Sequence, residues 1–306
     1  MNRTKVLLLV AAVLATPVLA GCSDTADDGP ETVANPQTTV SATADGDGGT
    51  TTGVDVDAYS DAEEREIRQA TIAALDGVSD VRLVGTLEQT VSDGTRNQSR
   101  TVDFEKTIDA ANRRLVLDQT VSVQGRTINQ TSYLLNGSFY VRSPVLEQQY
   151  GSNWVTQNVS ESYDRVWRNT STLYMHRALL EVSDVQVTGT ETVRGEQAYV
   201  VVLRPDQDEL ANVSGPNFQG SQVNELDATM YVSTETDLVL RSVLHVNQTV
   251  RTPSGQELTA IVDVERDFLA YDEGVTVTLP EEADDAVPLG GNTTNRTTAR
   301  SVAGIA

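Results

Sequence analysis

The side chains that could act as nucleophiles, bases or metal ligands are few. The 306 residues include one cysteine, Cys22, and two histidines, His176 and His245, which lie 69 positions apart. A single cysteine excludes an intramolecular disulfide, and two distant histidines offer little for a metal site. A Ser-His-Asp site needs a histidine beside its serine. His245 falls on the polar side of a strand pattern and His176 lies in a helical pattern, so we expect both at the surface or its boundary.

Acidic residues are too numerous to identify a site. Paired carboxylates serve glycosidases, but among 44 Asp and Glu any one pair is uninformative. The runs Asp24-Asp27-Asp28 and Asp284-Asp285 are typical of solvated charge, with weak Ca²⁺ or Na⁺ binding as the alternative. No EF-hand, Walker or dinucleotide glycine motif is present. The sequence therefore predicts no catalytic residue, no metal site and no cofactor, and a protein that is not an enzyme.

The N-terminus carries the clearest pattern. A short positive region with Arg3 and Lys5 precedes an apolar run over residues 6–15, and small residues lead to Leu19-Ala20-Gly21-Cys22. This is the layout of a secretory signal. Its end resembles the lipobox of lipoproteins, in which the cysteine thiol takes a diacylglyceryl group. We predict a signal peptide over 1–21 and a lipid on Cys22 that anchors the protein to the outer face of the cell membrane.

The same segment has two alternative interpretations. A buried core helix would make Cys22 a small hydrophobic side chain. A single-pass membrane anchor would need a longer span than ten to fifteen apolar residues. Arg3 stands alone where a twin-arginine signal has a pair, so the export route stays open.

The net charge excludes one class of partner. The chain has 22 Lys and Arg against 44 Asp and Glu, a net charge of −22. Such a surface repels phosphate backbones, so we expect no nucleic-acid binding. Only Lys5 and Lys106 are lysines. An acid excess with a lysine shortage resembles proteins of salt-loving archaea, in which high salt screens the repulsion between carboxylates.

Both ends of the chain lack apolar periodicity beyond the signal. Residues 22–58 hold eight acids and no cation among Thr, Gly, Ala and Ser. Such a segment cannot bury enough surface to offset the entropy of ordering. We predict an acidic disordered tether over 22–58 and a polar disordered tail over 281–306, with one folded domain over 59–280 between them.

The middle of the chain predicts a helix followed by many strands. Ser60 and Glu63 have capping-box spacing at the start of an amphipathic stretch over 59–75. From Val81 the apolar period becomes two, with turn signals about every ten residues, of which Asn136-Gly137 is the strongest. Helical patterns interrupt the strands over 163–167, 171–182 and 206–213. The pattern predicts an α+β fold, a curved antiparallel sheet of about ten or eleven strands with helices packed on one face.

The order of these elements resembles that of the lipoprotein-carrier superfamily, which includes the bacterial lipoprotein-localisation carrier and the mycobacterial lipid-binding lipoproteins. The likeness covers about residues 59–280 and includes a hairpin over 193–201 and a close over 275–280. Haloarchaeal lipoproteins of unknown role share this layout. The resemblance implies a half-open β-barrel whose helices cover the concave face and whose apolar cavity holds acyl chains. It implies binding without catalysis.

The apolar strand faces leave a choice between pocket and core. If the helices cover a curved sheet incompletely, the uncovered part is an apolar pocket suited to lipid. If they cover it completely, the same side chains are ordinary core. Residues 238, 240, 244 and 246 are predicted to share one face, as are 258, 260, 262, 264 and 268. The candidates for ligand contact are Leu238, Leu240, Val262, Phe268 and Trp154.

Asn-x-Ser/Thr sequons are frequent, and an exported chain can carry glycans on them. The alternative is that a domain rich in Asn, Ser and Thr produces them by chance. Asn136 also forms a sequon, but it lies in a predicted tight turn. We expect a few of the others to be used: Asn97, Asn129, Asn158, Asn169, Asn212, Asn247, Asn292 and Asn295.

Two functions from different classes fit the sequence. The first is a lipid-anchored extracytoplasmic protein that binds or carries a hydrophobic ligand, either a lipid or the acyl or isoprenoid chain of a lipoprotein. The second is a non-catalytic envelope sensor, or a protein-interaction or structural module on the cell surface. The ligand, any protein partner and the oligomeric state do not follow from the sequence.

The lipid anchor is testable by removing one sulfur. We expect Cys22→Ser to release the protein from membranes, because the serine hydroxyl cannot take the lipid through a thioether. Fractionation of cells that produce each form measures the result. Membrane association that persists in Cys22→Ser would contradict the anchor.

Overall fold

The computed structural model describes residues 59–206, 221–252 and 255–289. Some sequence predictions lie outside these residues: the signal peptide over 1–21, lipidation of Cys22, the tether over 22–58, almost all of the helix over 206–213, the tail from residue 290, and the sequons at Asn212, Asn292 and Asn295.

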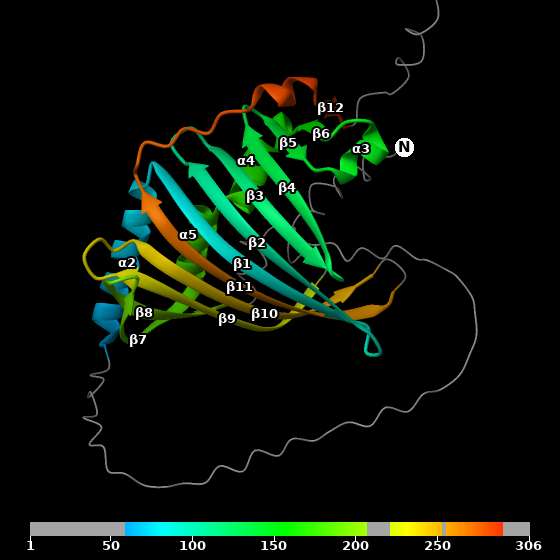
Figure 1. Cartoon of the computed structure of the whole chain (residues 1–306). Coiled ribbons are helices and arrows are strands. Elements are labelled where there is room, and N and C mark those ends of the chain that lie inside the picture. The colour runs from blue at the N-terminus through cyan, green and yellow to red at the C-terminus, as the bar shows by residue number, and fades with distance from the viewer. Residues whose placement is uncertain (1–58, 207–220, 253–254, 290–306) are drawn as a thin grey trace, which may run out of the picture.

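The described chain forms one curved, open sheet with helices on one side (Figure 1). The strand order is β12-β6-β5-β4-β3-β2-β1-β11-β10-β9-β8-β7, and every pair is antiparallel except β12 with β6. The strands are β1 (Asp80–Ser92), β2 (Asn97–Asp109), β3 (Arg114–Val123), β4 (Arg126–Leu135), β5 (Ser138–Arg142), β6 (Trp154–Asn158), β7 (Ser183–Val193), β8 (Glu196–Pro205), β9 (Ser221–Ser233), β10 (Val239–Arg251), β11 (Glu257–Tyr271) and β12 (Val287–Pro288). The helices are α2 (Asp61–Gly77), α3 (Val145–Tyr150), α4 (Tyr163–Thr170) and α5 (Thr172–Val182), with short 3₁₀ turns at Ser160–Ser162 and Glu281–Asp285. The predicted class, an α+β fold with a curved and unclosed antiparallel sheet, is confirmed.

Local sequence signals account for the start of α2 and for a tight hairpin. The Ser60 hydroxyl accepts a hydrogen bond from the Glu63 N–H at 3.4 Å, and the Glu63 carboxylate accepts one from the Ser60 N–H at 2.8 Å. This reciprocal pair is the predicted capping box. Asn136 and Gly137 join β4 to β5 with φ angles of 52° and 75°, the left-handed conformation that a two-residue type I′ turn requires. Both predictions are confirmed.

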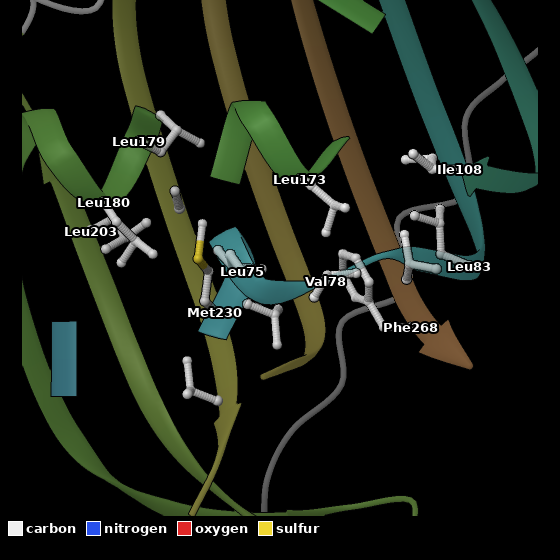
Figure 2. Close-up of a cluster of buried hydrophobic side chains, with 14 of the residues drawn as sticks. Leu75, Val78, Leu83, Ile108, Leu173, Leu179, Leu180, Leu203, Met230 and Phe268 are labelled. Carbon is white, nitrogen blue, oxygen red and sulfur yellow. The ribbon is translucent and has the colours of Figure 1, made fainter. Parts of the chain in front are cut away.

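The core lies between helices α2 and α5 and the face of the sheet that curves around them (Figure 2). Leu75 of α2, Leu180 of α5, Leu83 of β1 and Phe268 of β11 belong to one buried cluster there. The Phe268 ring stacks on Tyr271 with 5.8 Å between ring centroids. Removal of this apolar surface from water, at about 25 cal/mol per Å², is the main force that holds the helices in the curve.

One predicted strand face is wrong at Leu240. The pairing of β10 with β9 shifts register between Val239 and Arg241, so a β-bulge replaces strict alternation. Val239 consequently faces the main core. Leu240 packs on the other face in a small cluster with Val193, Ala198 and Tyr231.

The predicted boundary of the folded domain is also corrected. Residues 281–289 belong to the fold, because the turn at Glu281–Asp285 buries Ala283 and β12 pairs in parallel with β6. The Leu289 N–H donates to the Thr156 carbonyl at 2.7 Å. The segment is rich in acids, so its sequence did not indicate the few contacts that hold it against the sheet.

A glycine in β1 makes room for an aromatic ring. A Cβ at Gly85 would lie 2.3 Å from the Glu265 carbonyl oxygen and 2.5 Å from Cζ of Phe104. We expect Gly85→Ala to lower the free energy of unfolding by about 1–3 kcal/mol, the usual range for overpacking, as measured by chemical unfolding. Gly77→Ala is the control, because nothing lies within 4 Å of a Cβ there. Equal stability of the two variants would contradict this packing.

Candidate ligand-binding groove

A groove of about 200 Å³ opens on the concave face of the sheet. Strands β1, β2, β3, β10 and β11 form its floor, and residues 169–172, where α4 meets α5, contribute to its rim. Its apolar lining consists of Leu87, Val102, Phe104, Leu117, Met175, Leu244, Val246, Val262 and Val264. The groove is therefore built mainly from the inward-facing side chains of neighbouring strands.

The groove exists because the helices cover the concave face incompletely. Along β1, Leu83 is fully buried beneath the helices, whereas Leu87 lines the groove. Along β11, Phe268 and Val262 differ in the same way, since Phe268 is 1% exposed and Val262 is half-buried. Helix α5 begins beside this opening, so the buried core passes directly into an apolar surface that is open to small molecules.

Three cations lie among these apolar side chains: Arg100 and Lys106 of β2, and Arg266 of β11. The register sets Lys106 opposite Leu83 and Arg266 opposite Gly85, so the two charges share one face on either side of β1. All three side chains are half-buried. Among the described residues, no Asp or Glu lines the groove.

Lys106 is held by neutral acceptors alone. Its Nζ donates to the Thr170 carbonyl and to Oγ1 of Thr172 at 3.2 Å. Burial, followed by the charge of Arg266, lowers the pKa of Lys106 to about 7. The ammonium and amine forms therefore coexist near neutral pH.

Arg266 has no compensating partner at all in the part of the chain that the structure describes. Burial lowers the pKa of Arg266 to about 10, which leaves the guanidinium charged at neutral pH. The Nε of Arg100 is likewise buried without a hydrogen-bond partner among residues 59–206, 221–252 and 255–289.

Arg241, on the opposite face of the sheet, is paired with two carboxylates. Arg241 contacts Asp267 at 2.8 Å and Glu265 at 3.3 Å. A larger hollow of about 790 Å³ lies on that face, but it is lined by acids and hydroxyls. Asp103 there accepts from Thr86 at 3.0 Å. Within the described ranges no group of His, Cys, Asp or Glu could hold a metal ion, and no helix is long and apolar enough to cross a membrane. The mainly apolar lining of the groove, compared with the acids and hydroxyls of the outer hollow, makes the groove the stronger candidate site for a lipid-like ligand.

His176 contradicts its predicted place at the surface or its boundary. It is 1% exposed, with its ring centroid 5.3 Å from that of Phe268. Its position follows from α5, which lies inside the curve of the sheet. Burial, then the charges of Arg266 and Lys106, holds the pKa of His176 well below its usual range. The ring is neutral, and its Nδ1 has no partner among the described residues.

Of the five candidates for ligand contact, Val262 alone lines the groove. Phe268 is buried in the core and Leu238 packs against it. Leu240 lies on the opposite face because of the β-bulge between Val239 and Arg241. Trp154 is buried on β6, 6.0 Å from the ring of Tyr133. Ligand contact by Val262 stays a prediction.

The prediction named none of the three groove cations, although the sequence carried a signal for two of them. In β2, residues 102, 104 and 108 are apolar and face inward, and the missing member of the series is Lys106. In β11, the series 260, 262, 264 and 268 is broken in the same way by Arg266. A charged residue at an inward position of an apolar alternation marks a buried charge.

The described sequons differ in accessibility. Asn97, Asn129 and Asn158 are exposed, whereas Asn169 and Asn247 are half-buried. Asn169 also lines the groove. Glycosylation at each of them stays a prediction.

Comparison with known proteins identifies similar folds at low similarity. No protein-family model and no curated protein matches the chain. The solved structure of LprF from Mycobacterium bovis is 13% identical and covers 72% of this chain and 97% of its own, with a TM-score of 0.45. The lipoprotein LppX of Mycobacterium tuberculosis is 14% identical and covers 72% and 100%, with a TM-score of 0.42. A LolA superfamily protein from Nitrosomonas europaea is 9% identical and covers 72% and 96%, with a TM-score of 0.26. At these scores the likeness supports no functional conclusion for this chain.

The buried neutral His176 makes stability depend on pH. Because its pKa is lowered in the folded protein, only the unfolded chain takes up this proton as the pH falls through about 6.5. Relative to His176→Met, the wild type should therefore lose up to about 1.4 kcal/mol of unfolding free energy per pH unit between pH 6.5 and 5.

His245→Gln is the control with the opposite sign. The hydrogen bond to Asp263, at 2.6 Å, raises the pKa of His245, so the wild type should gain stability relative to this variant as the pH falls. Unfolding measured at several pH values tests both. A stability difference between wild type and His176→Met that does not change with pH would contradict the neutral buried ring.

Proposed function

We propose that this domain binds the hydrocarbon chain of a lipid or lipid-like ligand in the concave groove. The observation that carries the proposal is the apolar lining left uncovered where α5 begins. Each Å² of apolar surface removed from water contributes about 25 cal/mol, so a hydrocarbon chain that displaces water from this lining is favoured. The groove adjoins the core, whose rigid packing preserves its shape.

The cellular setting belongs to the same proposal. Residues 1–22 support export and a lipid on Cys22, and the acidic segment over 22–58 would hold the domain away from the outer face of the membrane. The order of elements, with α2 first and α3 to α5 between β5 and β7, supports membership of the lipoprotein-carrier superfamily. We propose binding or carriage without catalysis. An envelope sensor or interaction module is the alternative.

Filling the groove tests the proposal. Val262 lies on the groove floor, whereas Val243 of β10 is 39% exposed and lines no part of it. We expect Val262→Trp to weaken uptake of a fluorescent acyl probe by delipidated protein by about tenfold or more, equivalent to 1.4 kcal/mol, and Val243→Trp to leave it unchanged.

Titration of the probe in high salt measures both affinities. Wild-type protein that takes up no probe would contradict the proposal and favour the interaction module. Equal weakening by the two substitutions would place binding elsewhere.

A further inference from the structure

The groove differs in charge from the rest of the molecule. The chain has a net charge of −22, yet three cations and, among the described residues, no carboxylate line the groove. One of the two lysines of the whole chain, Lys106, lies there. The local excess of positive charge therefore opposes the overall composition.

Cations in an apolar setting are unfavourable unless an opposite charge or hydrogen bonds compensate them. Arg241 receives such compensation from two carboxylates on the outer face. Lys106 has only neutral acceptors, and Arg266 has no partner in the described residues. Burial lowers the pKa of both groups, and no carboxylate among the described residues that line the groove supplies the opposite charge that would offset it. An anion placed between them would supply it.

The surroundings suit an anion joined to an apolar chain. Ser171 caps α5 and Thr172 begins it, and both residues line the groove beside Lys106. The N–H groups of a helix N-terminus add a favourable field for negative charge. Leu87, Val102 and Val262 line the same groove, so a polar end and an apolar floor are contiguous.

We propose that the ligand is an amphiphile with a single carboxylate or phosphate headgroup, which Lys106 and Arg266 bind, and a hydrocarbon chain that lies over Leu87, Val102 and Val262. The inference rests on the proposed function, because it assigns the polar end of the same ligand. One anionic head compensates both cations, whereas a neutral head leaves them unpaired.

Binding should depend on pH through Lys106. The charged group that faces it is Arg266 of β11, whereas Arg100 lies six residues away along β2 and His176 of α5 is neutral. A bound anion favours the ammonium form and therefore raises the pKa of Lys106 above its value of about 7 in the ligand-free protein. Affinity for the anion therefore falls as the pH rises from 7 to 9, while affinity for a neutral amphiphile does not change.

The test uses three probes at pH 7 on delipidated protein: decanoate, methyl decanoate and inorganic phosphate. We expect decanoate to bind about tenfold or more tightly than its methyl ester, the gain typical of a charge-assisted hydrogen bond. Lys106→Met and Arg266→Met should each reduce the ratio of the two affinities several-fold, through weaker binding of decanoate and not through a change in binding of the ester. Arg82→Gln, which removes an exposed cation paired with Glu273, should leave the ratio unchanged.

The outcomes separate the two proposals. Equal binding of decanoate and its ester by wild-type protein, a comparison that needs no variant, would overturn the anionic head and leave the apolar groove intact. Failure to bind either chain would overturn the proposed function itself. Phosphate that binds as tightly as decanoate would show a site for a free anion and contradict the amphiphile.

Discussion

The structure depends on the need to cover one apolar face of a strongly curved sheet. Every long strand presents alternate side chains to the inside of the curve, and no second sheet packs there in the described chain. Helices α2 and α5 bury the region around Leu83 and Phe268. The remainder of the face, around Leu87 and Val262, has no such cover and forms the groove. The core and the candidate site are therefore two parts of one concave surface. The helices cover the core part and leave the groove part open.

The two faces of the sheet also differ in their charged side chains. The outer face carries the acids together with paired cations such as Arg241. The groove on the inner face holds Lys106 and Arg266, with no Asp or Glu among its described lining residues, and burial lowers the pKa of both groups. His176, enclosed in the same region, stays neutral. A protein that is acidic as a whole thus encloses a basic interior, and this contrast distinguishes the groove from a packing defect in the core.

Much of the fold could be predicted from the sequence, because it depends on local rules. The capping box at Ser60, the turn at Asn136-Gly137 and the alternation in β11 each follow from the chemistry of a few neighbouring residues. The bulge at Leu240 and the burial of His176 could not be predicted, because both depend on how distant elements pack. The site was only partly predictable. Val262 was found from its apolar pattern, but Lys106 and Arg266 break that pattern, and their importance appears only once β2 and β11 are placed on either side of β1.

The central claim is that the concave groove holds an acidic amphiphile. Its most direct test is mass spectrometry of the material extracted from protein purified from its source cells, with Val262→Trp purified in parallel. The account predicts a near-stoichiometric acidic lipid with the wild type and much less with the variant. A wild-type protein that carries nothing apolar, or a lipid retained equally by the variant, would contradict it.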